Sequence, residues 1–404
     1  MVANIVGTDF TKIPPLSDNG LINGRGRFNC STPSYSNSTD WLGSYFDSNL
    51  TWTCVEAAQR SKFRFHSGKT HRLRLINHGA DGIQKISIDN HTMTVIATDF
   101  VPTQPYETEV VTLGVGQRTD VLVTANQDPE AAVWMRTQLP GGPMCGGLGP
   151  LGAPVPPFGA PMPPDTVYPD VMAAIYYEDA DTTVDPTSVT NLEPINCEND
   201  DLSLTQADFA IQPTEEPYIL DLVMTLALNE TRNFEWRMND EAYRSNFNKP
   251  ILYDVEAGQT SFPENPEWNV YNLAANKSVV LNVTNLTPFT HPMHLHGHTF
   301  FVLSVGPQDT VWNGNTVNPD NPMRRDVQII PSGGYAALQF EGDNPGVWPF
   351  HCHVAWHLSS GLAVNLISQP DDIVKIPAGM KASTCDAWER YSSSTVVDQI
   401  DSGS

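Results

Sequence analysis

HPMHLHGH at residues 291–298 and HCHVAWHLSSGL at residues 351–362 together hold seven of the eleven histidines of the chain. Both segments lie in surroundings that are rich in Val, Ile, Leu and Phe and are typical of β-strands. Successive side chains of a strand point to opposite faces of its sheet. We therefore expect the histidines and the cysteine of these segments to be sorted to the two sides of one sheet.

One face of this sheet is predicted to carry His291, Cys352 and, past a turn, His357. Two imidazoles and one thiolate, with a weak or absent axial ligand, form a blue-copper electron-transfer site. The axial position falls at Leu362, which has no donor atom, and the expected reduction potential is correspondingly high. The pattern predicts one copper site on this face.

The opposite face is predicted to carry four imidazoles, from His294, His296, His351 and His353. Imidazole binds copper and zinc alike, so this group by itself does not identify its metal. A single His-x-His pair is common in strands that bind no metal, and a His-rich tract can also bind zinc. The agreement of face, ligand type and spacing across both segments favours copper.

Short segments with strand composition, separated by turn residues, recur along the chain. They lie at residues 72–77, 85–89, 119–124, 278–284, 300–305, 336–340 and 363–367. Helical patterns are confined to pieces such as Val55–Arg60 and Ala382–Tyr391. The pattern predicts an all-β protein made of antiparallel β-sandwiches.

A length of 404 residues favours two domains. Residues 140–169 contain ten Pro and seven Gly, a composition that predicts a long surface loop. An acidic run follows this loop, and a new strand pattern begins after it, so we expect the boundary within residues 198–215. The predicted domains are residues 1–212 and 213–404.

The composition also excludes classes of partner. The chain has 22 basic and 46 acidic residues and a formal net charge of −24, which disfavours nucleic acids and anionic membranes. No apolar run reaches the roughly 18 residues of a membrane span. Eight Asn-x-Ser/Thr sequons favour a secreted glycoprotein, although residues 1–19 lack the pattern of a signal peptide.

The two histidine segments resemble the C-terminal copper signatures of multicopper oxidases, and specifically those of ascomycete-type laccases. The resemblance extends through NHTMTVIATDFVP (90–102), GQRTDVLV (116–123), NPMRRD (321–326), DNPGVW (343–348) and DSGS (401–404). It covers nearly the whole chain as the second and third cupredoxin domains of the family. The implied fold is two cupredoxin-like Greek-key β-sandwich domains.

The resemblance implies a role for each donor. His291, Cys352 and His357 would bind the type 1 copper, His294 the type 2 copper, and His296, His351 and His353 the type 3 pair. The implied reaction is one-electron oxidation of phenols or similar aromatic reductants, with dioxygen as the acceptor that is reduced to water. Related laccases place an acid that accepts the hydrogen bond of a phenol at the position of Asp81. A solvated turn residue is the alternative for Asp81.

Three further residues of these motifs have expected supporting roles. His298 lies within the motif, but the resemblance implies that it is not a copper ligand. We therefore expect it to support the site or the fold. Asp326 and Asp343 are candidates for carboxylates that orient the metal-binding histidines.

The family builds its trinuclear cluster from eight histidines, four of them from a first cupredoxin domain that this sequence does not show. The resemblance thus implies a complete type 1 site and half of the cluster, and predicts that the chain alone does not sustain dioxygen reduction. A non-enzymatic electron-transfer module and a truncated product of a longer laccase gene are the alternatives.

The cysteines are interpreted through the same resemblance. Cys145 and Cys197 resemble the disulfide of the second domain, and Cys385 resembles the cysteine that bridges to the first domain. Cys30 and Cys54 are candidates for a local pair.

Overall fold

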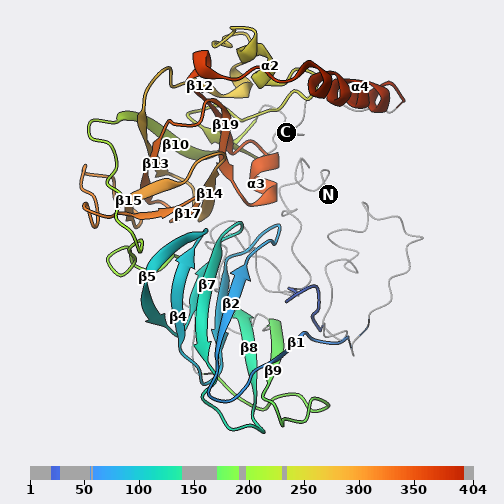
Figure 1. Cartoon of the computed structure of the whole chain (residues 1–404). Helices are drawn as coiled ribbons and strands as arrows, with labels where there is room; N and C mark the ends of the chain where they lie inside the picture. Colours follow the sequence, from blue (N-terminus) through green and yellow to red (C-terminus); the bar gives the residue numbers. More distant parts are fainter. Residues whose placement is uncertain are drawn as a thin grey trace.

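The computed structural model describes residues 20–27, 55, 58–138, 171–190, 197–229 and 234–394. Strands dominate this part of the chain and form four sheets (Figure 1). The prediction of an all-β protein is confirmed. No sheet among the described residues contains strands from both halves of the chain.

The first half consists of a five-stranded sheet, in the order β1-β9-β8-β3-β6, and a four-stranded sheet, in the order β2-β7-β4-β5. Val95, Val121 and Ile175 are among the fully buried residues between them. The strands are β1 (Lys62–Arg64), β2 (Thr70–Ile76), β3 (Gln84–Ile88), β4 (Met93–Thr98), β5 (Val101–Thr108), β6 (Val111–Leu113), β7 (Arg118–Thr124), β8 (Ala132–Gln138) and β9 (Val171–Tyr176).

The second half has a six-stranded sheet, in the order β11-β10-β13-β18-β15-β16, and a five-stranded sheet, in the order β12-β20-β19-β14-β17. The strands are β10 (Tyr218–Leu228), β11 (Phe234–Met238), β12 (Val270–Asn272), β13 (Ser278–Asn285), β14 (His291–Leu295), β15 (Phe300–Gly306), β16 (Met323–Arg325), β17 (Val327–Ile330), β18 (Tyr335–Glu341), β19 (Gly346–Cys352) and β20 (Ala363–Ser368). The helices are α2 (Ile251–Glu256), α3 (Ala355–Ser359), α4 (Ala378–Ser394) and the 3₁₀ turns η3 (Pro266–Trp268) and η4 (Pro370–Asp372).

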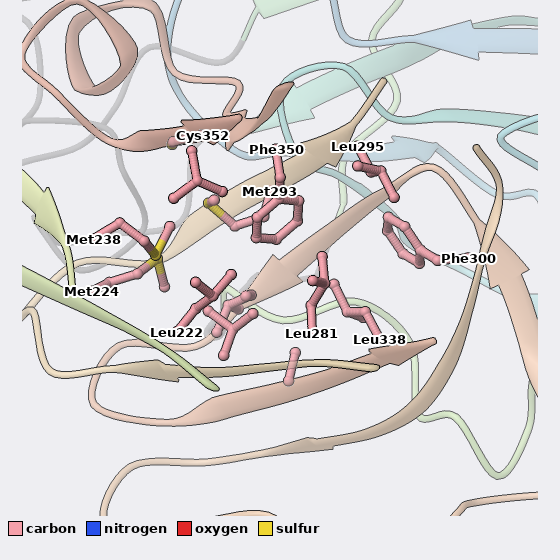
Figure 2. Packing of buried hydrophobic residues seen from close by; sticks show 14 of the residues in the cluster. Leu222, Met224, Met238, Leu281, Met293, Leu295, Phe300, Leu338, Phe350 and Cys352 are labelled. Carbon is pink, nitrogen blue, oxygen red and sulfur yellow. The ribbon is translucent and has the colours of Figure 1, made fainter. Parts of the chain in front are cut away.

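The core of the second half lies between its two sheets (Figure 2). Leu222, Leu281 and Leu338 come from the six-stranded sheet, and Met293 and Phe350 come from the five-stranded sheet. Burial of a side chain of this size contributes about 1.5–3 kcal/mol each. This core supports one face of β14 and β19, the strands that carry most of the expected metal donors.

Most of the strand pairs are antiparallel, as predicted, but the sheets are mixed. Three pairs run parallel: β1 with β9, β10 with β13, and β12 with β20. Between the two members of each pair the chain passes through the facing sheet, so it returns to the first sheet in its original direction. Strand composition does not reveal such crossovers, because both orientations bury the same alternating side chains.

Several expectations concern residues outside this description. They are the loop at 140–169, the terminal DSGS segment, and Cys30, Cys54 and Cys145. Of the predicted helical piece Val55–Arg60, the structure describes Val55 and residues 58–60, and these residues are not helical, so the prediction is wrong there. The piece Ala382–Tyr391 lies within α4, as predicted. Among the described residues no helix is long and apolar enough to cross a membrane.

Candidate metal centre

Strand pairing sorts the donors of the two histidine segments. In the antiparallel pair of β14 with β19, Met293 lies opposite Cys352 and His294 lies opposite His351. Met293 and Cys352 are fully buried in the core of the second half. Alternation turns His294 and His351 to the other face of the sheet. Figure 1 shows β14 and β17 on the side of the second half that faces β2, β4 and β7.

His291, Cys352 and His357 converge at the edge of this core. Their donor atoms lie within 4.8 Å of one another. The Nδ1 atoms of the two histidines are 3.1 Å apart, and Cys352 Sγ lies 3.6 Å from His291 Nδ1 and 3.5 Å from His357 Nδ1. His357 reaches the group because α3 begins three residues after the end of β19. The structure thus brings together the three residues that the spacing placed on one face.

The surroundings of this group suit a metal cation. Burial lowers the pKa of His357 to about 3 and that of His291 well below its ordinary value, so both imidazoles are neutral donors. Burial also raises the pKa of the Cys352 thiol, and the charge of Asp81 adds to the rise. A bound cation would stabilise the thiolate that this apolar environment otherwise disfavours. Two imidazoles and a thiolate are a donor set that fits copper.

Leu362 and Trp236 complete the immediate surroundings of the donors. Leu362 is fully buried in the same core, and its carbonyl oxygen accepts the Cys352 N–H at 3.1 Å. Its side chain offers the site no donor atom. The Trp236 ring lies 4.2 Å from the His357 ring and 4.8 Å from the His291 ring, measured between centroids. Trp236 could not be predicted from the histidine segments, because its strand, β11, lies far from both of them in the chain.

The four remaining imidazoles form a second, more open group. His296 Nε2 lies 2.9 Å from His351 Nε2, and the ring of His294 lies 4.9 Å from that of His296 and 5.7 Å from that of His353. His296 is exposed, whereas His351 is buried and its pKa is lowered to about 3, chiefly by burial. The structure therefore also assembles the set that alternation placed on the opposite face.

Backbone carbonyls orient two of these imidazoles. His294 Nδ1 lies 2.7 Å from the carbonyl oxygen of Asp326, and His351 Nδ1 lies 2.8 Å from that of Cys352. A carbonyl oxygen only accepts, so each Nδ1 carries the proton and each Nε2 keeps its lone pair. An imidazole that offers a free Nε2 lone pair is ready to bind a metal.

The first half of the chain packs against this open group. A Cβ atom at Gly116, which has φ of +86°, would overlap the His353 ring. The neighbouring Arg118 donates two hydrogen bonds to the Asp326 carboxylate, at 2.6 and 2.8 Å. Gly116 and Arg118 belong to the GQRTDVLV motif, so this motif supports the histidines from across the interface between the halves. The motif itself was visible in the sequence, but its contacts were not.

The expected supporting residues have different outcomes. Asp326 contacts His294 through its carbonyl oxygen, because its carboxylate is paired with Arg118. Asp343 is exposed; burial lowers the pKa of His298, and the negative charge of Asp343 partly opposes this lowering. His298 donates to the carbonyl oxygen of His296 at 3.1 Å and packs against Phe340. It therefore supports the backbone of the segment.

Asp81 lies in a loop of the first half that contacts α3. The Ala80 carbonyl oxygen accepts the Ala355 N–H at 2.9 Å, two residues before His357. Asp81 Oδ1 accepts the Gly82 N–H at 2.7 Å. Burial raises the pKa of the Asp81 carboxyl to about 7, which the hydrogen bond from Gly82 partly opposes. The residue is a candidate for proton transfer near neutral pH.

Of the remaining cysteines, Cys197 is disulfide-bonded and Cys385 is a free, exposed thiol on α4. The expected partner of Cys197, Cys145, lies outside the described residues.

We expect the metal-free protein to lose stability as the pH falls below about 6.5, the ordinary pKa of histidine. Above that value His351 and His357 are neutral in both the folded and the unfolded state. Between about 6.5 and 3 the unfolded state binds their protons more readily. Each histidine should then lower the free energy of unfolding by up to about 1.4 kcal/mol per pH unit.

Denaturant unfolding at a series of pH values measures this effect. The His357→Gln variant should show a shallower slope than the wild type over the same interval. Equal slopes in the two proteins would contradict the assignment of the lost stability to buried imidazoles.

Two family models match the chain, at residues 4–145 and 233–372, and both describe multicopper oxidases. Laccase-2 of Botryotinia fuckeliana is 32% identical over 96% of this chain and 62% of that protein. The crystal structure of a laccase from Botrytis aclada superposes with a TM-score of 0.76 and 31% identity, and covers 97% of this chain and 66% of that chain. The fold is therefore that of cupredoxin-like domains.

The chain spans about three fifths of the length of several of these curated relatives. Laccase-3 of Botryotinia fuckeliana is 33% identical over 87% of this chain and 71% of that protein. Agreement over so large a share of a whole relative, together with the two family matches, identifies the family: the chain belongs to the multicopper oxidases and is similar to the laccases of ascomycete fungi.

Proposed function

We propose that this chain takes single electrons from phenols or similar aromatic reductants at a copper site formed by His291, Cys352 and His357. The convergence of the three buried donor atoms within 4.8 Å is the observation that carries the proposal. Copper bound there supplies one-electron redox chemistry, and the two imidazoles and thiolate are the donor set of electron-transfer sites. Leu362, which lacks a donor atom, is proposed for the axial position.

His357 is the ligand through which a reductant reaches the site. Its exposed fraction is 9%, whereas that of His291 is 0%. Trp236 packs against the His357 ring and limits its movement. On the other side, the main chain joins Cys352 directly to His351 and His353, so few covalent bonds separate the two donor groups. The greater exposure of His357 and its contact with Trp236 favour electron entry at His357 over electron entry at His291.

Asp81 is proposed to accept the proton that a phenol loses on oxidation. Its loop contacts α3 beside His357, and its carboxyl has a pKa of about 7. A base with a pKa near the working pH transfers protons efficiently. Because the carboxyl must be ionised to accept the proton, the rate with phenols should rise as the pH increases through about 7.

Asp81→Asn should lower the rate at which a phenol bleaches the copper-loaded protein by about 100-fold, the lower end of general-base effects. It should also remove the rise near pH 7. Stopped-flow mixing without oxygen measures both. A non-phenolic electron donor releases no proton, and its rate should be nearly unchanged. Equal losses of rate with the phenol and the non-phenolic donor would contradict the proton-accepting role and indicate that Asp81 is a turn residue.

His294 is proposed as a ligand of type 2 copper, and His296, His351 and His353 as ligands of the type 3 pair. These four histidines are half of the eight that the family cluster uses. We therefore propose that the chain as printed performs the electron-accepting half of the reaction, and that dioxygen reduction to water needs further ligands. A non-enzymatic electron-transfer module is the second candidate, and the exposure of His296 favours it.

Copper loading followed by two measurements tests this function. Under anaerobic conditions a phenol should bleach the blue protein once, and an oxygen electrode should then record no sustained uptake. Zinc-loaded protein, which is redox-inert, is the control and should not oxidise the phenol. Failure of the phenol to bleach the copper protein would contradict the proposed substrate class. Sustained oxygen uptake would contradict the proposal that the four histidines form only half of the cluster.

We also propose that the protein acts outside the cell. Disulfides persist in oxidising compartments, and Cys197 is disulfide-bonded. The acidic composition of the chain also disfavours nucleic-acid and membrane partners, so small molecules and dioxygen are the proposed partners.

A further inference from the structure

His291 has a hydrogen-bond partner on the side of its ring that faces away from the metal donors. Its Nδ1 atom points to Cys352 and His357, and its Nε2 atom lies 2.8 Å from the hydroxyl oxygen of Thr287. Thr287 is in turn bonded to Asn285, at the end of β13. The exposed fractions of His291, Thr287 and Asn285 are 0%, 2% and 0%. Water therefore does not substitute for any of these contacts.

The amide of Asn285 has only one orientation that satisfies its neighbours. Its Nδ2 group donates to the carbonyl oxygens of Phe289, at 2.7 Å, and Pro331, at 2.8 Å. Its Oδ1 atom then faces Thr287 and accepts both the backbone N–H, at 2.9 Å, and the hydroxyl proton, at 2.7 Å. A flipped amide would place two donors against the Thr287 N–H.

The Thr287 hydroxyl has a single proton, and the atoms around it determine where that proton goes. Asn285 Oδ1 and the Phe289 carbonyl oxygen, at 3.2 Å, both accept only. The proton is directed to one of them, and the hydroxyl oxygen therefore accepts from His291 Nε2–H. It follows that His291 is protonated on Nε2 and presents the lone pair of Nδ1 to Cys352 and His357.

Among the described residues, the His357 ring has no hydrogen-bond partner equivalent to Thr287. Within the described residues the His357 ring forms hydrogen-bond contacts through Nδ1 only, and the ring is positioned by packing against Trp236. The two imidazoles of the site are therefore held differently. His291 is oriented by a buried hydrogen-bond chain, whereas the ring of His357 is the one proposed to contact the reductant.

We propose that Thr287, fixed by Asn285, is a positioning residue that selects the metal-binding tautomer of His291 and increases the basicity of its Nδ1 atom. Partners on the far nitrogen of a ligating histidine act in this way and typically change metal affinity by about 10- to 100-fold. The inference deepens the proposed type 1 copper site and rests on it.

The same network explains one of the eight sequons. Asn285 and Thr287 form an Asn-x-Thr pattern, but the amide nitrogen of Asn285 is buried and donates to two carbonyl oxygens. The buried hydrogen-bond network therefore accounts for the pattern, and the Asn285 amide is not accessible to a glycan in the folded protein.

The tautomer is tested first in the metal-free 404-residue chain by ¹⁵N NMR of labelled histidine. The His291 signals are assigned by their absence from the His291→Gln variant. We expect the Nε2–H form in the wild type and in Thr287→Ser. A wild-type His291 that is protonated on Nδ1 would overturn the inference even if no variant folds. This experiment requires no copper, so it also separates the inference from the proposed function.

The second test compares Thr287→Val with Thr287→Ser in copper-binding titrations against a competing chelator. Valine keeps the shape and removes the acceptor, and the Thr287 N–H still satisfies Asn285 Oδ1. We expect 10- to 100-fold weaker copper binding in the valine variant and a higher reduction potential, because a less basic imidazole stabilises Cu(II) less. The serine variant should resemble the wild type.

Thr103→Val is the matched control, because the buried Thr103 hydroxyl has no hydrogen-bond partner among the described residues. It should leave the copper affinity and the potential unchanged. Copper binding by Thr287→Val within twofold of the wild type, at an unchanged potential, would overturn the positioning role. A wild type that forms no blue copper site would instead contradict the proposed function.

Discussion

Cys352→Ser will abolish the blue colour of the copper-loaded protein. The colour of a site with two imidazoles and one thiolate arises from charge transfer between sulfur and Cu(II), and serine removes the sulfur. Cys352 is the sulfur ligand available to the group, since its Sγ lies 3.5–3.6 Å from both imidazole donors. We expect the visible band to be lost completely, as measured by absorption spectroscopy after copper loading.

Cys385→Ser is the matched control, because Cys385 is also a free thiol but is exposed on α4. This variant should keep the full intensity of the band. Copper bound by the four-imidazole group should survive in both variants, since neither substitution touches His294, His296, His351 or His353. A Cys352→Ser protein that stays blue would show that the thiolate comes from elsewhere.

Asp99→Asn will lower the free energy of unfolding by about 3 kcal/mol. This value is the lower end of the range for removing one partner of a buried ion pair. The Asp99 side chain is 0% exposed and joins the two halves of the chain. It accepts hydrogen bonds from the Arg118 N–H at 2.8 Å, from Arg325 Nε at 3.1 Å and from the Val327 N–H at 3.3 Å. An asparagine has one acceptor oxygen for these donors and removes the carboxylate that is paired with the buried Arg325.

Asp185→Asn provides the comparison for this prediction. Asp185 pairs with Arg27 and Arg60, but 47% of its side chain is exposed. Water and salt weaken such pairs, and the change should cost less than about 1 kcal/mol. Denaturant titrations at one pH compare the two variants. Equal losses would show that the burial of Asp99 adds nothing to its contribution.

Strand positions and donor grouping could be predicted from the sequence because both depend on a local period. The segments at 72–77, 119–124, 278–284 and 363–367 lie within or overlap strands of the structure. The alternation of side chains along a strand separated His291 from His294, and Cys352 from His351, without any knowledge of the partner strand. That the separated groups then meet across β14 and β19 follows from the register of one antiparallel pair.

Hydrogen-bond partners within the motifs were less predictable. Asp326 was expected to orient a histidine by its carboxylate, but the carbonyl oxygen makes the contact because Arg118 occupies the carboxylate. The choice between these two groups of one residue depends on a side chain 208 positions away in the chain. Thr287 lies only four residues from His291, yet its role depends on the buried turn that Asn285 stabilises.

By itself, then, the sequence determined the all-β class, the expected donor residues and their division into two groups, since residue type and a period of two are local properties. Tertiary structure alone decided that Trp236 packs against the donors, that Gly116 leaves room for the His353 ring, and that three strand pairs run parallel. These features arise where elements distant in the chain pack together. Their geometry is set by how two sheets and two halves fit, which no single segment encodes.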